Sequence, residues 1–201
     1  KISIKSVREV MPQTNITLMT NRDTEIEGVD QVISISSVKN ASDKVFYLEK
    51  APYRKNIFLD SDTYVENDIS EIFDMLEKFD FALAHDPNRI WKDQENIPKS
   101  FTQYNTGVFG FKKSDKVQTF FELWQQKYEE LKEKEDIILD QVSFRSTLFH
   151  SKDIRVATLP PEYNCRFNRP GYLQEDVKVL HGRLINNDRD VGMENRISVE
   201  T

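Results

Sequence analysis

The stretch "RKNIFLDSDTYV", residues 54–65, decides the fold of this chain, because it carries an apolar run directly into two carboxylates. The apolar residues 57–59 predict a buried strand. Asp60 and Asp62 follow it one residue apart, and two like charges at that spacing repel each other and resist leaving water. A bound cation would offset that cost, and carboxylate oxygens are ligands suited to Mg²⁺ and Mn²⁺. The stretch therefore predicts a metal site at the end of a strand; the alternative is a turn with two solvated aspartates.

The composition is that of a globular chain. Of the 201 residues, 38% are hydrophobic and 11% are aromatic, which suffices for one domain with a substantial core. We expect a single domain over residues 1–201, with 185–201 as a candidate tail. The net charge of −6 argues against nucleic-acid binding, which favours a basic surface. Cys165 is the single cysteine, so an internal disulfide bond is excluded.

The distribution of apolar residues also bears on where the protein resides. No apolar run approaches the ~20 residues that a membrane span needs. The chain does not open with a charged and then apolar signal segment. On these grounds we expect no membrane span and a cytoplasmic location.

Short apolar runs alternate with amphipathic stretches along the chain. Strands are predicted at 16–20, 32–36, 56–59, 81–85, 106–111, 154–159 and 177–180. Helices are predicted at 1–10, from 41 toward 51, from 114 or 115 to 131, and over 136–149. This alternation indicates a doubly wound α/β fold with a mostly parallel sheet flanked by helices.

The α/β pattern also predicts where ligands bind. In such folds ligands gather beyond the carboxyl ends of the strands. Asp60, Asp62, Asp86 and His181 each lie at or just past the end of an apolar run. We therefore expect these four side chains in one neighbourhood.

Five segments carry a resemblance to a known family. In order they are "APYRKNIFLDSDTYVENDI" (51–69), "QYNTGVFGFKKSD" (103–115), "LDQVSF" (139–144), "LPPEYNCRF" (159–167) and "VKVLHGR" (177–183). Together they resemble the GT-A fold nucleotide-diphospho-sugar glycosyltransferases of the glycogenin-like, retaining type. The resemblance covers roughly residues 1–185. It implies a GT-A fold, with its DxD motif at Asp60 and Asp62, and a transferase of the hexosyltransferase type (class EC 2.4).

The resemblance implies a metal cofactor and two substrates. Asp62 would be the main ligand of Mn²⁺ (or Mg²⁺), Asp60 its partner, and His181 the third ligand from the protein. The diphosphate of a nucleotide-diphospho-sugar donor, with a UDP-sugar favoured, would fill the remaining positions. The metal would stabilise negative charge on the leaving diphosphate. The acceptor would be a glycan or a small molecule.

Further residues receive roles on the sugar side of the site by the same resemblance. Asn105 would face the donor sugar, and Asp86 would hydrogen-bond sugar hydroxyls. Asp140 would bind a donor hydroxyl, and Gln141 would lie near the anomeric carbon. Read without the resemblance, Asp86 and Asn105 suit turns, and Asp140 and Gln141 an exposed helix face.

The remaining assignments concern the rest of the donor. Thr106 and Gly107 would let the backbone approach the donor closely. Lys44 matches a basic residue that contacts the diphosphate or donor. Gly182 follows the histidine ligand, and Arg183 stands where an anion-binding lysine is usual.

Several alternatives stay open at this point. The resemblance implies a first strand that holds the nucleotide base, and this chain starts at the helix that would follow it. A degenerate domain would bind a nucleotide sugar or glycan without turnover. A phosphohydrolase would use Asp60 as its nucleophile. Within the transferase interpretation, a retaining front-face displacement competes with inversion, in which Asp140 would be the general base.

Overall fold

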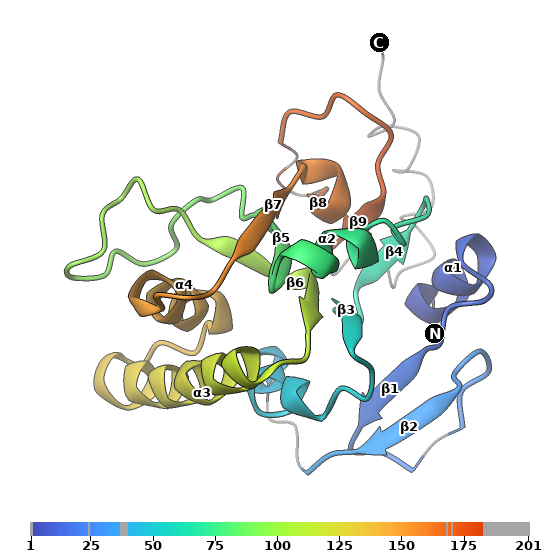
Figure 1. Cartoon of the computed structure of the whole chain (residues 1–201), viewed down its shortest axis with the longest axis horizontal. Coiled ribbons are helices and arrows are strands. Elements are labelled where there is room, and N and C mark those ends of the chain that lie inside the picture. The colour runs from blue at the N-terminus through green and yellow to red at the C-terminus, as the bar shows by residue number, and fades with distance from the viewer. Residues whose placement is uncertain (1, 24, 37–39, 168, 170, 183–201) are drawn as a thin grey trace.

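The structure, a computed structural model, describes residues 2–23, 25–36, 40–167, 169 and 171–182 (Figure 1). The helices are α1 (Ile2–Val10), α2 (Ile72–Lys78), α3 (Asp115–Glu135) and α4 (Asp140–His150), with the 3₁₀ helices η1 (Ala41–Phe46), η2 (Leu48–Lys50) and η3 (Pro161–Asn164). The strands are β1 (Thr17–Thr20), β2 (Gln31–Ser34), β3 (Lys55–Leu59), β4 (Thr63–Val65), β5 (Phe81–His85), β6 (Tyr104–Lys112), β7 (Val156–Leu159), β8 (Cys165–Arg166) and β9 (Val179–His181). Arg183 and the candidate tail lie outside the described residues.

The central sheet has the strand order β3-β6-β5-β7 and confirms the predicted α/β class. Its directions are mixed, which corrects the prediction of a mostly parallel sheet. β5 and β7 run parallel, but β6 is antiparallel to both β3 and β5. The physical reason is the segment 86–103, which joins β5 to β6 without a helix. Parallel neighbours need a crossover connection, and a segment without one returns the chain antiparallel.

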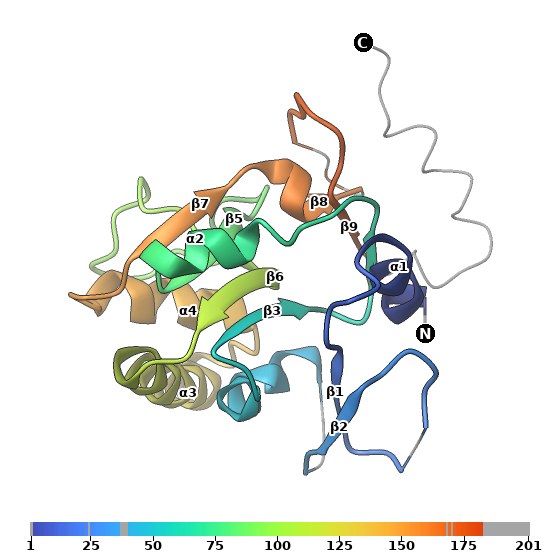
Figure 2. The ribbon, with the colours of Figure 1, turned by 45° about the vertical axis from the view of Figure 1, so that its right-hand side comes forward.

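Helices cover both faces of this sheet. Figure 2 shows β3 and β6 between α2 on one side and α3 on the other. Side chains alternate between the two faces along each strand. In β5, Phe81 and Leu83 therefore join the core beneath α3 and α4, whereas Ala82 and Ala84 join the core beneath α2.

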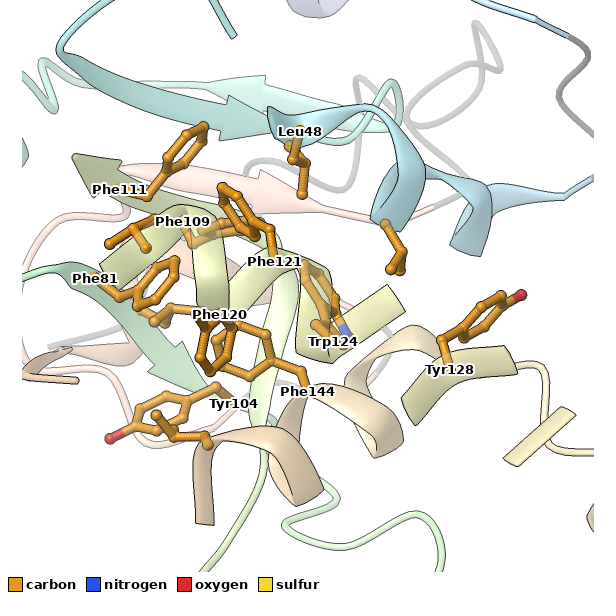
Figure 3. Close-up of a cluster of buried hydrophobic side chains, with 14 of the residues drawn as sticks. Leu48, Phe81, Tyr104, Phe109, Phe111, Phe120, Phe121, Trp124, Tyr128 and Phe144 are labelled. Atoms are coloured by element: carbon orange, nitrogen blue, oxygen red, sulfur yellow. The ribbon is translucent and has the colours of Figure 1, made fainter. Parts of the chain in front are cut away.

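The core beneath α3 and α4 is strongly aromatic. In Figure 3, Phe81, Phe120 and Phe144 lie against one another, with ring centroids 5.0–5.7 Å apart. Trp124 packs on Phe144 and donates its indole N–H to the backbone oxygen of Asp140. Large aromatic side chains contribute much of a core's buried area. Because Trp124 also bonds the first residue of α4, this core fixes where that helix begins.

A smaller sheet of order β4-β9-β8 extends the molecule beyond the end of β3. β9 lies between the other two strands, antiparallel to β4 and parallel to β8. The predicted strand at 177–180 is observed two residues later, as Val179–His181. This shift places His181 inside the strand, directly opposite Thr63.

The predicted helix between residues 41 and 51 is two short 3₁₀ helices. Backbone bonds of the tighter type, such as Tyr47 N to Lys44 O and Ala51 N to Leu48 O, hold them. Such helices occur as short connecting pieces. Among the described residues, no helix is both long and apolar enough to cross a membrane.

Candidate active site

The two aspartates lie on a tight turn between β3 and β4. Asp60 O accepts hydrogen bonds from Thr63 N (3.2 Å) and from the Thr63 hydroxyl (2.7 Å). β4 then pairs with β9, and this pairing places His181 opposite Thr63. Gly182 N donates to Asp62 O at 2.9 Å and ties the end of β9 to the same turn. The pairing of two short strands therefore joins residues more than a hundred positions apart.

Asp60, Asp62 and His181 form a group that fits a metal ion. One ligand atom from each lies within 4.8 Å of the others. The imidazole Nε2 of His181 is 3.6 Å from Asp62 Oδ1 and 3.7 Å from Asp60 Oδ2. Two ligands of one Mn²⁺ or Mg²⁺ ion lie about 3–4 Å apart, given metal–ligand distances near 2.1 Å. Two carboxylates and one imidazole form a donor set that suits either ion.

Gly107 provides the space for this group. A Cβ atom on Gly107 would lie 2.0 Å from His181 Cε1 and 2.8 Å from Asp60 Oδ2. β6 places the residue there, because Gly107 O accepts the backbone N–H of Asp60 at 2.7 Å. Only a residue without a side chain fits between the histidine and the aspartate.

Lys44 is the positive charge at the centre of the site. Its ammonium lies 3.1 Å from both oxygens of Asp60, 3.3 Å from Asp140 Oδ2, and donates to Thr106 O at 2.8 Å. Burial alone lowers the pKa of Lys44, but the carboxylates of Asp140 and Asp60 outweigh it and the pKa is raised. Burial raises the pKa of Asp60, although Lys44 opposes this. Lys44 is thus the counter-ion shared by the half-buried Asp60 and the buried Asp140.

Asp140, the first residue of α4, is held firmly. Ser42 donates to its Oδ1 at 3.1 Å, and Thr106 donates to its Oδ2. Asp140 is buried, with 8% of its surface exposed. Both carboxylate oxygens are therefore engaged within the protein.

Asp86 and Gln141 lie next to each other, with Asn105 between them and the metal group. Asp86 Oδ2 accepts from Asn105 Nδ2 at 2.8 Å and from Gln141 Nε2 at 3.0 Å. Its Oδ1 accepts from the backbone and side chain of Asn88. Burial raises the pKa of Asp86, but these hydrogen bonds outweigh it, and the pKa lies below the ordinary value.

A cleft of about 1020 Å³ lies over the site. Of the residues assigned from the sequence, those that line it are Lys44, Asp60, Asp62, Asn105, Thr106, Gly107, Asp140, Gln141 and His181. Asp86 and Gly182 do not line it, and Arg183 is outside the described residues. The exposed ring of Trp91 also lines the cleft. A cleft of this size can hold a ligand as large as a nucleotide sugar.

The sequence did not predict a role for two residues at the site, Asn164 and Arg166. Asn164, on η3, contacts both His181 and Asn105. Arg166 pairs with His181 across β8 and β9 and lines the cleft. His181 lowers the pKa of Asp62, and Arg166 adds to this effect. Both lie in the segment "LPPEYNCRF", whose resemblance was noted without a role for either side chain.

Comparison with known proteins identifies the class. The model of the family "nucleotide-diphospho-sugar transferase" matches residues 55–197, which is more than half of the chain. The chain therefore belongs to this family, and the resemblance seen in the sequence is confirmed. Among curated proteins, no sequence match is found.

Solved structures show the same fold. The galactosyltransferase LgtC, in complex with donor and acceptor sugar analogues, is 13% identical, with a TM-score of 0.61 over 100% of this chain and 92% of that one. The apo form of the glycosyltransferase GlyE from Streptococcus pneumoniae TIGR4 is 18% identical, with a TM-score of 0.59 over 90% of this chain and 49% of that one. The predicted GT-A fold is thereby confirmed.

Proposed function

We propose that this protein transfers a sugar from a nucleotide-diphospho-sugar, a UDP-sugar in the first instance, to a glycan or small-molecule acceptor. The reaction is of the hexosyltransferase type and depends on Mn²⁺ or Mg²⁺. The observation that carries the proposal is the convergence of Asp60, Asp62 and His181 in the cleft of a chain from this family.

These three side chains would hold the cation, with Asp62 as the main ligand. When bound, such an ion stabilises negative charge on a leaving diphosphate. Arg166 suits the phosphates of the donor, because it lines the cleft beside Asp62 and its Nε has no hydrogen-bond partner among the described residues. Arg183 lies outside the described residues, and its contact with the phosphates stays a proposal.

The sugar end of the donor would lie along Asn105, Thr106 and Gly107, which share one wall of the cleft. Gln141 lies on the same cleft, and we assign it to the vicinity of the anomeric carbon. Asp140 would accept from a donor hydroxyl. Asp86 reaches the sugar through Gln141 rather than directly, since it does not line the cleft.

We propose that Lys44 offsets the negative charge of the carboxylates that line the cleft. Its contacts with Asp60 and Asp140 place one positive charge between the two carboxylates while a donor binds. Its ammonium already contacts these two carboxylates and Thr106 O. A contact between Lys44 and the diphosphate therefore requires that one of these three contacts breaks.

We propose that the donor's anomeric configuration is retained. Inversion would need Asp140 as a general base, but both of its oxygens already accept hydrogen bonds and Lys44 lies 3.3 Å away. These contacts would have to break before either oxygen could take a proton from an acceptor hydroxyl. Proton NMR of the first-formed product checks this, and an inverted anomeric centre would contradict it.

The first experiment is thermal-shift binding of nucleotide diphosphates and nucleotide sugars, each with and without Mn²⁺. A ligand that binds only the folded state raises the melting temperature. We expect a Mn²⁺-dependent shift with UDP and with one UDP-sugar, and slow hydrolysis of that sugar nucleotide. Asp62→Ala should abolish both effects, whereas Asp74→Ala, on the exposed face of α2, should change neither. Absence of any nucleotide-dependent shift in the unmodified protein would contradict the proposal. A shift without turnover would favour a binding domain.

A further inference from the structure

A chain of buried hydrogen bonds leads away from the metal group behind the cleft. His181 Nδ1 lies 2.8 Å from Asn164 Oδ1, and Asn164 Nδ2 donates to Asn105 Oδ1 at 2.8 Å. Asn105 Nδ2 donates in turn to Asp86 Oδ2 at 2.8 Å. All four side chains are at most 3% exposed. Solvent therefore does not compete for these bonds.

Gly107 N and Asp86 determine which atom donates and which accepts in each of these hydrogen bonds. A backbone N–H only donates, so Gly107 N, at 3.0 Å, requires an oxygen at the Asn105 Oδ1 position. An ionised carboxylate only accepts, so Asp86 requires the Asn105 Nδ2 group on its side. Asn164 must then donate to Asn105 with its own Nδ2 group. Its oxygen is consequently the atom that faces His181.

This order of donors decides the protonation of the histidine. Asn164 Oδ1 accepts from Nδ1–H, so the hydrogen bond from Asn164 places a ring proton on Nδ1. Nε2 is 3.6 Å from Asp62 and 3.7 Å from Asp60, both beyond hydrogen-bonding distance. In the neutral ring with its proton on Nδ1, the Nε2 lone pair points to the space between Asp60 and Asp62, where a cation would bind. Partners of this kind tune how strongly a histidine binds a metal.

We propose that Asn164 is a positioning residue that holds the neutral His181 imidazole as its Nδ1–H tautomer and so presents Nε2 to the metal. Its own orientation is set by Asn105, which Gly107 N and Asp86 fix in place. The proposal rests on the proposed function for the identity of the ligand group. The sequence predicted that Asp86 binds sugar hydroxyls. In this proposal Asp86 instead fixes the far end of the series of hydrogen bonds, by accepting from Asn105.

The first test is long-range ¹H–¹⁵N NMR of the metal-free, unmodified protein. The chain contains three histidines, so each imidazole can be assigned. The spectrum is recorded at about pH 9, where an ordinary imidazole is neutral. We expect His181 as the Nδ1–H tautomer. A predominant Nε2–H tautomer would overturn the proposal without any variant.

The second test uses variants and the binding of Mn²⁺ alone, followed by the EPR signal of free Mn²⁺. Asn164→Leu removes the acceptor, and we expect a mixed tautomer and a loss of about 10–100-fold in Mn²⁺ affinity. Asn164→Asp keeps an acceptor for Nδ1–H but loses the donor to Asn105 Oδ1, so we expect it to keep the tautomer and to bind Mn²⁺ more tightly than Asn164→Leu does. Asn56→Leu is the matched control. Asn56 is a buried asparagine on β3 whose side chain bonds to the backbone of Tyr53, so its loss should leave Mn²⁺ affinity unchanged.

A folded Asn164→Leu variant with unchanged Mn²⁺ affinity would overturn the proposal. If that variant does not fold, the tautomer of the unmodified protein and the Asn164→Asp variant decide. Failure of the proposed function gives a different pattern. The unmodified protein would then show the Nδ1–H tautomer but bind no Mn²⁺, which supports the role of Asn164 in the histidine geometry and removes the metal site.

Discussion

The ammonium group of Lys44 lies 3.1 Å from both carboxylate oxygens of Asp60, one of the two aspartates of the metal group. The same ammonium lies 3.3 Å from Asp140. One ammonium group is therefore shared between two carboxylates. A cation that binds beside Asp60 shares that carboxylate with Lys44, so the two positive charges must be accommodated together.

Replacement of Lys44 by methionine should destabilise the fold. The variant leaves the buried Asp140 and the half-buried Asp60 without their shared counter-ion, and loss of one partner of a buried ion pair costs about 3–5 kcal/mol. Urea denaturation followed by circular dichroism measures the change. Lys5→Met, which removes an exposed ion pair with Glu9, should cost at most about 1 kcal/mol. Equal effects of the two replacements would contradict a central role for Lys44.

Gly107→Ala should damage the metal site and leave the fold largely intact. The added Cβ would lie 2.0 Å from the imidazole of His181, which must move away from the aspartates. We expect Mn²⁺ affinity to fall at least about tenfold. Gly171→Ala is the control, because among the described residues its Cβ would meet Pro161 alone, at an ordinary contact distance of 3.9 Å. Titration of Mn²⁺ by EPR compares them, and equal affinities would refute the expected clash.

Arg166→Gln should weaken the binding of a nucleoside diphosphate more than that of the monophosphate. A hydrogen bond to a charged group contributes about 1.5–3 kcal/mol, which corresponds to roughly 10–100-fold in affinity. Calorimetry with UDP and UMP in the presence of Mn²⁺ measures the difference. Arg54→Gln, which removes an exposed arginine paired with Glu77, should bind both nucleotides as the unmodified protein does. A uniform loss for UDP and UMP would assign Arg166 to another part of the donor.

The stability contributed by Asp86 should depend on pH. Hydrogen bonds from Asn105, Asn88 and Gln141 outweigh the effect of burial and hold its pKa below the ordinary value of 3.8. A lowered pKa contributes stability that is present above the pKa of the unfolded chain and is lost as the pH falls through that of the folded protein. The stability difference between the unmodified protein and Asp86→Asn should therefore be constant near neutral pH and shrink below about pH 4. Urea titrations between about pH 3 and pH 7 test this, and a difference that grew on acidification would contradict it.

Local patterns predicted most of the elements and the acidic pair of the site. The amphipathic run of α3 was recognised because its apolar residues repeat every three or four positions, and Ser114 caps it as expected. Asp60 and Asp62 were found because an apolar strand delivers them. The roles of Asp140 and Gln141 followed from the resemblance alone, since their local sequence suits an ordinary helix face.

The sequence by itself determined the α/β class, the order of the elements and the acidic pair after β3, because hydrophobic periodicity and strand ends are local properties of the chain. Only the tertiary structure decided the mixed direction of the sheet and the partners of the site residues. Lys44 meets Asp140, and Asn164 meets His181, through the pairing of strands and the packing of η1 against α3 and α4. Such contacts depend on register and on long-range packing, and no spacing along the chain specifies them.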